Sequence, residues 1–265
     1  MARGPKKHMK RITAPKSWLI SKMGGVYTVR PAQGPHKLRK SIPLELILRH
    51  KLKLALNHQE AYKIMKQKEG LVLVDQKVRR NPKFPVGLMD VVSIPKCGYN
   101  YRLLYDVKGR FTFTKLSEGQ AGFKLCRVQK KSVGSNQVVY LVTHDGRTIR
   151  FADRDIKTHD TVKFDFKTRE VLDFYQMKVG NLAYISDGNN RGRVGRIVSI
   201  KQFPGSNDLV TLQDAKKRVF TTKIWYVFVI GKGEKAEIRL PKRRGLKMTI
   251  LEEAEERLKN ERERD

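Results

Sequence analysis

The sequence has only two cysteines, Cys97 and Cys126, with 28 residues between them. No CxxC pair occurs, and no Cys or His stands near either thiol at metal-ligand spacing, so we expect no zinc or other metal site. We expect both thiols to be small buried groups in a reducing compartment.

Long apolar runs are also missing. Apolar runs such as residues 226–230 have the length of a strand, whereas a membrane-spanning helix needs about 20 apolar residues. The first ten residues are rich in Gly, Pro and Lys and do not resemble a secretory signal. We therefore expect no membrane partner.

No catalytic arrangement of residues is evident. The six histidines include no HExxH pair, and His144 and Asp145 are adjacent in an expected turn, where a catalytic triad would draw on separated segments. We therefore expect no enzymatic activity, no cofactor and no small-molecule substrate.

Positive charge is abundant: 57 Lys and Arg face 26 Asp and Glu, which gives a formal net charge of +31 over 265 residues. Self-repulsion at this charge density opposes compaction, whereas a phosphate backbone offers Coulomb attraction and counterion release. The composition therefore predicts a nucleic acid partner.

The first segment, residues 1–41, is predicted to be a basic arm. Residues 1–40 hold 11 Lys and Arg and no acid, so little apolar surface can offset chain entropy, and we expect disorder until RNA binds. Trp18, Leu19, Ile20 and Met23 form one apolar cluster, which we expect to dock on a folded domain.

Residues 42–105 are predicted to form a second module of two helices and a small sheet. Apolar spacing predicts a first helix up to Ala55, with Arg49 and Lys53 one turn apart on its outer face. Asn57 and Glu60 form a capping box that begins the second helix. Strands are expected at 71–74 and 91–94, on either side of a basic turn at 75–80.

This module resembles the alpha-L RNA-binding domain of ribosomal protein four. The resemblance is carried by residues 70–79 (GLVLVDQKVR), 84–87 (FPVG) and 90–94 (DVVSI). The usual Asp-Gly turn is Asp75-Gln76 here, and without Gly a left-handed turn is less favourable.

Residues 106–175 are predicted to form a central β domain. Hairpins are expected from 101–106 to 111–116, about Lys108-Gly109, and from 138–143 to 148–151, about a turn that contains Asp145-Gly146. With strands at 162–166 and 171–175, this set could close into a small antiparallel barrel.

Residues 176–231 carry the sharpest motif, VGNLAYISDGNNRGRVGRIV at 179–198. It resembles the KOW motif, in which a glycine-rich basic turn joins two strands, and strands at 209–213, 218–222 and 226–230 would complete an SH3-like barrel. Glycines let backbone approach a phosphate closely. A P-loop is not favoured, because no helix and no Lys-Ser or Lys-Thr follows.

Residues 232–265 are predicted to be a charged tail. A capping box at Thr249 and Glu252 should begin an exposed helix. Its mixed charge suits a protein neighbour better than RNA.

The order of arm, alpha-L domain, β domain, KOW barrel and tail resembles the eukaryotic and archaeal family of small-subunit ribosomal protein four over essentially the whole chain. Residues 2–11 (ARGPKKHMKR), 34–39 (GPHKLR), 141–145 (LVTHD) and 229–233 (VIGKG) also resemble that family, and the long tail favours its eukaryotic branch.

The resemblance implies an α+β, mostly β, multi-module protein that is a structural constituent of the small subunit. Such a protein would bind small-subunit ribosomal RNA, support assembly and translation, and contact neighbouring ribosomal proteins. It would act on cytoplasmic ribosomes after nuclear and nucleolar passage.

The residues expected to contact RNA are cations of the arm, the alpha-L face and the KOW turn. They are Arg3, Lys6, Lys7, Lys10, Arg11, Lys16, Lys37, Arg39, Lys40, Arg49, Lys53, Lys77, Arg79, Arg80, Arg191, Arg193 and Arg196.

Two alternatives from other classes remain open. A KOW-containing transcription-elongation factor would not require the cationic arm. An RNA-modifying enzyme with an alpha-L domain, such as a pseudouridine synthase, would need a further catalytic domain of well over ~100 residues, for which the chain has no unassigned segment.

Overall fold

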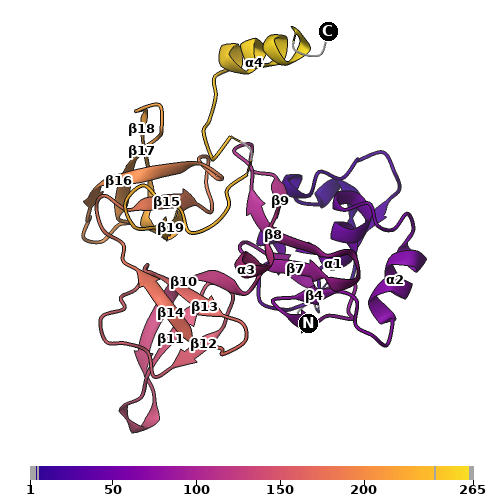
Figure 1. The fold of residues 1–265 in the computed structure, drawn as a ribbon, viewed down its shortest axis with the longest axis horizontal. Helices are drawn as coiled ribbons and strands as arrows, with labels where there is room; N and C mark the ends of the chain where they lie inside the picture. The colour runs from indigo at the N-terminus through magenta and orange to yellow at the C-terminus, as the bar shows by residue number, and fades with distance from the viewer. Residues whose placement is uncertain (1–3, 5, 242, 263–265) are drawn as a thin grey trace.

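The computed structural model describes residues 4, 6–241 and 243–262 (Figure 1). The fold is α+β and mostly β: the described residues form three five-stranded and two two-stranded antiparallel sheets, with few helices. Short 3-10 turns lie at Arg11–Thr13, Lys16–Trp18, Leu38–Lys40, Pro95–Cys97 and Ile224–Tyr226. No helix in the described ranges is both long and apolar enough to span a membrane.

The arm is folded against the next module. Strand β1 (Met9–Lys10) pairs with β2 (Tyr27–Thr28), and the fully buried Trp18 donates from Nε1 to the Ser41 carbonyl oxygen at 2.7 Å. The prediction of a disordered arm is therefore wrong for the described part of the arm. Its sequence has little apolar surface, but Trp18 packs into the core of its neighbour. Of the predicted docking cluster, Ile20 also packs there, whereas Leu19 and Met23 are exposed.

Replacing Trp18 by Leu should loosen this attachment. The change removes the hydrogen bond to Ser41 and leaves a void, at a cost of about 2 kcal/mol. Amides of β1 and β2 should then exchange faster with solvent in hydrogen-exchange measurements on the free protein. Met23→Ala is the control, since Met23 is 88% exposed. Unprotected β1 and β2 amides in the parent would contradict a docked arm.

The first helix is shorter than predicted. After β3 (Ser41–Pro43), which pairs with β6 (Pro85–Gly87), helix α1 (Leu44–Leu46) passes into a π-helical turn at Ile47–Lys51. Lys53 has a left-handed φ of 55° and lies outside this helix. Arg49 and Lys53 are therefore not stacked on one helical face, and Arg49 instead pairs with Glu45 at 3.0 Å.

Helix α2 (His58–Lys66) begins at the predicted capping box. The Glu60 carboxylate accepts hydrogen bonds from the backbone N–H groups of Leu56 and Asn57, at 2.7 and 3.4 Å. The capping prediction is confirmed, because these contacts satisfy donors at the helix start.

The first large sheet has the order β5-β4-β7-β8-β9. Its strands are β4 (Leu73–Val74), β5 (Lys77–Val78), β7 (Val91–Ile94), β8 (Tyr99–Tyr105) and β9 (Phe111–Lys115). The predicted hairpin about Lys108-Gly109 forms, and both of its strands belong to this sheet, so the boundary predicted after residue 105 falls inside it.

The turn between β4 and β5 forms without glycine. Asp75 and Gln76 both adopt left-handed conformations, with φ of 51° and 59°, as a primed hairpin turn requires. The Asp75 carboxylate is held in place, because its Oδ1 accepts from the Val91 N–H at 3.0 Å.

The central sheet has the order β12-β11-β10-β13-β14. Its strands are β10 (Phe123–Val133), β11 (Val139–Thr143), β12 (Thr148–Arg150), β13 (Thr161–Asp165) and β14 (Val171–Tyr175), preceded by helix α3 (Glu118–Ala121). The predicted hairpin β11–β12 is confirmed, and the strands predicted at 162–166 and 171–175 form as β13 and β14, which pair with each other. Strand β10, in the middle of the sheet, was not predicted. The order leaves β12 and β14 as outer strands, so the described pairings give an open sheet where a closed barrel was predicted.

The third sheet follows the predicted strands closely, in the order β18-β17-β16-β15-β19. These strands are β15 (Leu182–Ile185), β16 (Val194–Lys201), β17 (Leu209–Gln213), β18 (Val219–Lys223) and β19 (Val227–Gly231). The described pairings leave β18 and β19 as outer strands, so they do not close the predicted SH3-like barrel. Helix α4 (Ile250–Arg262) then projects from the body (Figure 1). Its predicted capping box is confirmed, with reciprocal contacts of 2.9 and 3.3 Å between Thr249 and Glu252.

The three sheets are tied together by buried polar contacts. The Tyr184 hydroxyl accepts from the Tyr105 N–H at 2.7 Å and donates to the Tyr105 carbonyl at 2.9 Å, which joins the third sheet to the first. Arg127 of the central sheet donates to the carbonyl oxygens of Trp225 and Val227. One hydrophobic core is continuous from the arm through the first sheet to the third.

Candidate nucleic-acid interface

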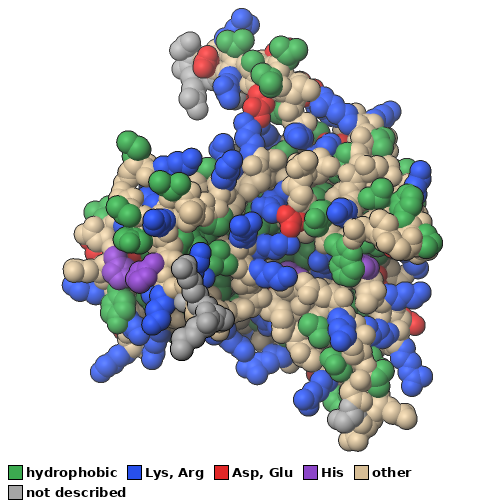
Figure 2. All heavy atoms as spheres, turned by 180° about the vertical axis from the view of Figure 1, so that it is seen from behind, with side chains coloured by type: hydrophobic (Ala, Val, Ile, Leu, Met, Phe, Trp, Pro, Cys, Tyr) green, Lys and Arg blue, Asp and Glu red, His purple; other side chains and the backbone are tan. Residues whose placement is uncertain are grey.

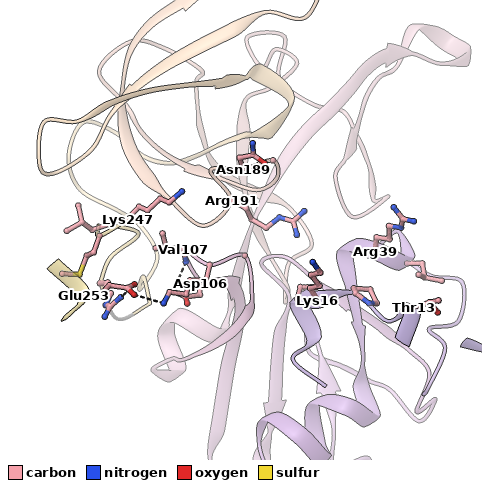
Figure 3. Close-up of a pocket in the computed structure, with 18 residues that line it drawn as sticks. Thr13, Lys16, Arg39, Asp106, Val107, Asn189, Arg191, Lys247 and Glu253 are labelled. Atoms are coloured by element: carbon pink, nitrogen blue, oxygen red, sulfur yellow. Dashed lines mark hydrogen bonds and ion pairs between the residues drawn. The ribbon is translucent and has the colours of Figure 1, made fainter. Parts of the chain in front are cut away.

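A cleft of about 830 Å³, which we call the main cleft, lies where four separate segments of the chain meet. In Figure 3 the arm supplies Lys16 and Arg39, the β15–β16 loop supplies Asn189 and Arg191, and the C-terminal segment supplies Lys247. The β8–β9 turn, residues 106–109, also lines it. The cleft therefore joins arm and loop, two regions predicted from sequence to contact RNA.

The cleft walls carry an excess of positive charge. Two carboxylates, Asp106 and Glu253, face six cations: Lys16, Arg39, Lys108, Arg191, Arg243 and Lys247. Lys and Arg side chains are also spread over the face shown in Figure 2, where carboxylates are few. Such a surface attracts and holds a polyanion.

A glycine allows the β15–β16 loop to reach the β8–β9 turn. Gly192 has a left-handed φ of +83°, and a Cβ at this position would overlap the Asp106 carbonyl oxygen. The close approach of these two backbones brings Arg191 beside Asp106 and Gly109 in the cleft wall.

Gly192→Ala should destabilise the protein more than Gly205→Ala. Both glycines are left-handed, but nothing lies within 4 Å of a Cβ at Gly205. Alanine strains both backbones, while only at Gly192 does it also force the loop away from the β8–β9 turn. We expect a difference of about 1–2 kcal/mol in the free energy of unfolding, measured by chemical denaturation. Equal losses would contradict the close approach.

Arg191 is held in a fixed position at the cleft. Its guanidinium lies over the Tyr105 ring, 4.7 Å from the centroid, and pairs with Asp187. Although burial opposes ionisation of Asp187, hydrogen bonds from Lys40 and Arg191 lower the pKa of this carboxyl to about 2. The buried Nε of Arg191 has no hydrogen-bond partner among the described residues.

The other two arginines predicted in this loop lie elsewhere. Arg193 is buried, pairs with Asp214 at 3.2 Å and covers the Phe220 ring. It is thus an internal residue of the third sheet, contrary to the expectation of a surface contact. Arg196 is exposed, and donates to the Gly180 carbonyl at 3.1 Å and approaches Glu234 at 3.5 Å.

A second, smaller cleft of about 360 Å³ collects other predicted cations of the arm and the first helix. Lys7, Arg11 and Arg49 line it, together with Arg30 and Lys83. Arg11 is partly engaged, because it donates to the Ser21 and Gly24 carbonyl oxygens of the arm itself.

The remaining predicted cations are spread over the surface. Lys6, Lys10, Lys37, Lys40, Lys53, Lys77 and Arg80 are exposed. Arg79 is half-buried, with its guanidinium 4.5 Å from the centroid of the Phe84 ring, and Arg80 donates to the Lys68 carbonyl. Arg3 lies outside the described residues.

Sequence reasoning missed three cations of the main cleft: Lys108, Arg243 and Lys247. Lys108 was recognised only as a turn residue. Arg243 and Lys247 lie in a basic stretch, residues 242–247. That stretch is the sequence feature that could have indicated an RNA contact here.

A buried ionic cluster joins the first and central sheets. Lys124, fully buried on β10, donates from Nζ to Asp75 at 3.1 Å, to Asp145 at 2.9 Å and to Asp90. Although burial opposes its charge, the three carboxylates raise the pKa of Lys124 well above its usual value. Arg147 bridges Asp75 and Asp145, so the cluster is a charged link between modules.

Cys126, His144 and Asp145 lie together beside this cluster. Asp145 is already engaged by the Lys124 ammonium, and burial raises the pKa of the Cys126 thiol. Burial also lowers the pKa of His144 to about 3, so it is neutral. The trio fits a structural role. Cys126 is buried as predicted, whereas the same prediction for Cys97 is wrong, because it lies in an exposed turn.

Comparison with known proteins agrees with this architecture. The family described as Ribosomal family S4e matches residues 97–171, the RS4NT (NUC023) domain matches residues 3–39, and the 40S ribosomal protein S4 C-terminus matches residues 214–261. The crystal structure of the 30S ribosomal protein S4e from Thermoplasma acidophilum is 33% identical, with a TM-score of 0.64 over 75% of this chain and 99% of that chain.

Curated relatives match over nearly the full length. Small ribosomal subunit protein eS4 is 50% identical in Bombyx mori, over 97% of each chain. The protein of the same name in Tetrahymena thermophila is also 50% identical, over 95% of this chain and 97% of that protein.

A basic, mostly β chain with these matches falls in the class of small-subunit ribosomal proteins. Within that class, the chain belongs to the eS4 family.

Proposed function

We propose that this chain is a structural constituent of the small ribosomal subunit that binds small-subunit ribosomal RNA and supports its assembly and translation. Six cations from four segments converge on one cleft, and this is the observation that carries the proposal. Cations placed this way position a phosphate backbone without reading base sequence.

The modules have distinct parts in this proposal. The arm (1–41), the KOW SH3-like barrel (176–231), the β8–β9 turn and the start of the tail form the main cleft, and the alpha-L domain (42–105) with the arm forms the second. The central β domain (106–175) is linked to the alpha-L domain by the Lys124 cluster and to the barrel by Arg127. The tail (232–265) also meets a neighbouring ribosomal protein. Membership of the eS4 family supports a role without catalysis.

The transcription-elongation factor and the RNA-modifying enzyme are not favoured by the comparisons, since the full-length relatives are named as small ribosomal subunit proteins. We further propose residence on cytoplasmic ribosomes after passage through the nucleolus.

Sedimentation of tagged protein from cells through a sucrose gradient tests the proposal. Tagged protein should comigrate with small subunits and remain there after a wash in moderate salt. Migration with polymerase complexes, or as a free protein, would contradict it.

A further inference from the structure

The first turn of helix α4 is placed against the cations of the main cleft. Glu253 lies 2.9 Å from the Lys108 ammonium through Oε2 and 3.0 Å from Arg243 through Oε1. Lys108, Arg243 and Glu253 all line the cleft. Glu256 also pairs with Arg243, so two cleft cations are held by carboxylates of one helix.

The same turn holds two further cations beside the third sheet. Glu252 lies 2.7 Å from the Lys216 ammonium and also accepts from Arg218. Its second oxygen accepts from the Thr249 N–H at 2.9 Å, which fixes the start of the helix.

Apolar contacts contribute little to this attachment. Ile250, Leu251 and Leu258 are 88%, 76% and 55% exposed, and the helix projects from the body in Figure 1 and Figure 2. The described contacts that hold its first turn are surface ion pairs between the half-buried Glu252 and Glu253 and partly exposed cations. Such pairs are weak and are screened by salt, so little free energy holds the helix to the body.

The charge of the helix is opposite to that of the chain. Five glutamates face three Lys and Arg within Ile250–Arg262, in a chain of net charge +31. A carboxylate on Lys108 or Arg243 occupies the position that a phosphate oxygen would take in a charge-assisted hydrogen bond. RNA adds counterion release to this contact, so it should displace the glutamates.

We propose that α4 is an acidic latch, which occupies cations of the cleft in the free protein and is displaced by the phosphates of an RNA backbone. The inference rests on the proposed function, because it assumes that the cleft takes RNA. The latch would weaken binding to RNA that fills only part of the cleft, and an RNA that also engages Lys108 and Arg243 would open it.

Two variants of equal charge test the latch. Glu252→Gln with Glu253→Gln removes two of the three carboxylates that hold the cations, leaves Glu256 on Arg243, and keeps a side-chain oxygen for Thr249. Glu255→Gln with Glu261→Gln removes two exposed carboxylates that do not line the cleft. Both pairs raise the net charge by two, so they should affect non-specific attraction equally.

Binding is measured with a short RNA hairpin of mixed sequence, at low and at physiological salt. The latch variant should bind roughly three- to tenfold more tightly than the control at low salt, and the gain should shrink as salt rises. In the parent, amides of α4 should exchange faster with solvent in the RNA complex than in the free protein.

Equal affinities for the latch and control variants would overturn the latch, whether both match the parent or both tighten. The variant Lys16→Gln, Arg39→Gln, Lys247→Gln, measured alongside, reports on the cleft itself. If this triple variant binds RNA weakly while the latch and control variants bind with equal affinity, only the latch is overturned. If it binds RNA like the parent, the proposed cleft fails and the latch fails with it.

Discussion

Replacing Lys16, Arg39 and Lys247 together by Gln should weaken RNA binding roughly 10- to 100-fold at low salt. These cations approach the cleft from its two sides (Figure 3). Lys16 and Arg39 come from the arm, and Lys247 comes from the C-terminal segment. The slope of log affinity against log salt should flatten by about 2 to 3, since each lost phosphate contact removes roughly 0.7 to 0.9.

The matched control is Lys157→Gln, Lys167→Gln, Lys201→Gln, which removes the same charge from exposed positions outside the cleft. It should leave most of the affinity and the slope intact. The free energy of unfolding of both variants should lie within about 0.5 kcal/mol of that of the parent. Equal loss of affinity in the two variants would mean that RNA affinity depends only on the net charge of the chain and not on the cleft.

Lys124→Met should destabilise the protein by about 3–5 kcal/mol. The side chain is 1% exposed and is the shared partner of Asp75, Asp90 and Asp145. Its removal leaves carboxylates buried with too few cations, and burying an unpaired charge is costly. Chemical denaturation measures the loss.

Lys96→Met is the control, because Lys96 pairs with Glu69 at the surface, where both side chains are more than half exposed. It should change stability by no more than about 1 kcal/mol. Adding Asp90→Asn to Lys124→Met should restore part of the lost stability, since Asp90 has no arginine partner in the cluster. A double variant no more stable than Lys124→Met would contradict the unpaired charge as the cause.

Local signals in the sequence predicted much of the fold. Capping boxes at Asn57 and Thr249 begin helices as expected, and the turns at Lys108-Gly109 and Asp145-Gly146 join the expected strands. Each of these signals acts over a few residues, and tertiary packing did not override it.

Strand β10 escaped prediction for a physical reason. Phe123–Val133 carries Lys124 and Arg127 at buried positions, so hydrophobic and polar residues do not alternate as in a strand with one solvated face. Their partners, Asp75 and the Trp225 carbonyl, lie 49 and 98 residues away. No local sequence pattern could show that these two side chains would find hydrogen-bond partners in the protein interior.

The sequence predicted which types of residue form the candidate site, but not which of those residues the fold brings together. Lys16, Arg39 and Arg191 were expected to bind RNA, yet only the folded arm and the Gly192 contact bring them to one cleft. Arg193 has the same sequence context as Arg191 but turns inward to Asp214. Only the pairing of Arg193 with a carboxylate that is distant in the sequence distinguishes this structural arginine from Arg191 at the cleft surface.

Protein–RNA crosslinking in purified small subunits, followed by mass spectrometry, tests the central claim most directly. Crosslinked nucleotides should map to peptides that contain Lys16, Arg39, Lys108, Arg191 and Lys247. Crosslinks confined to other surfaces of this chain, with these peptides unmodified, would contradict the assignment of the cleft as its ribosomal RNA contact.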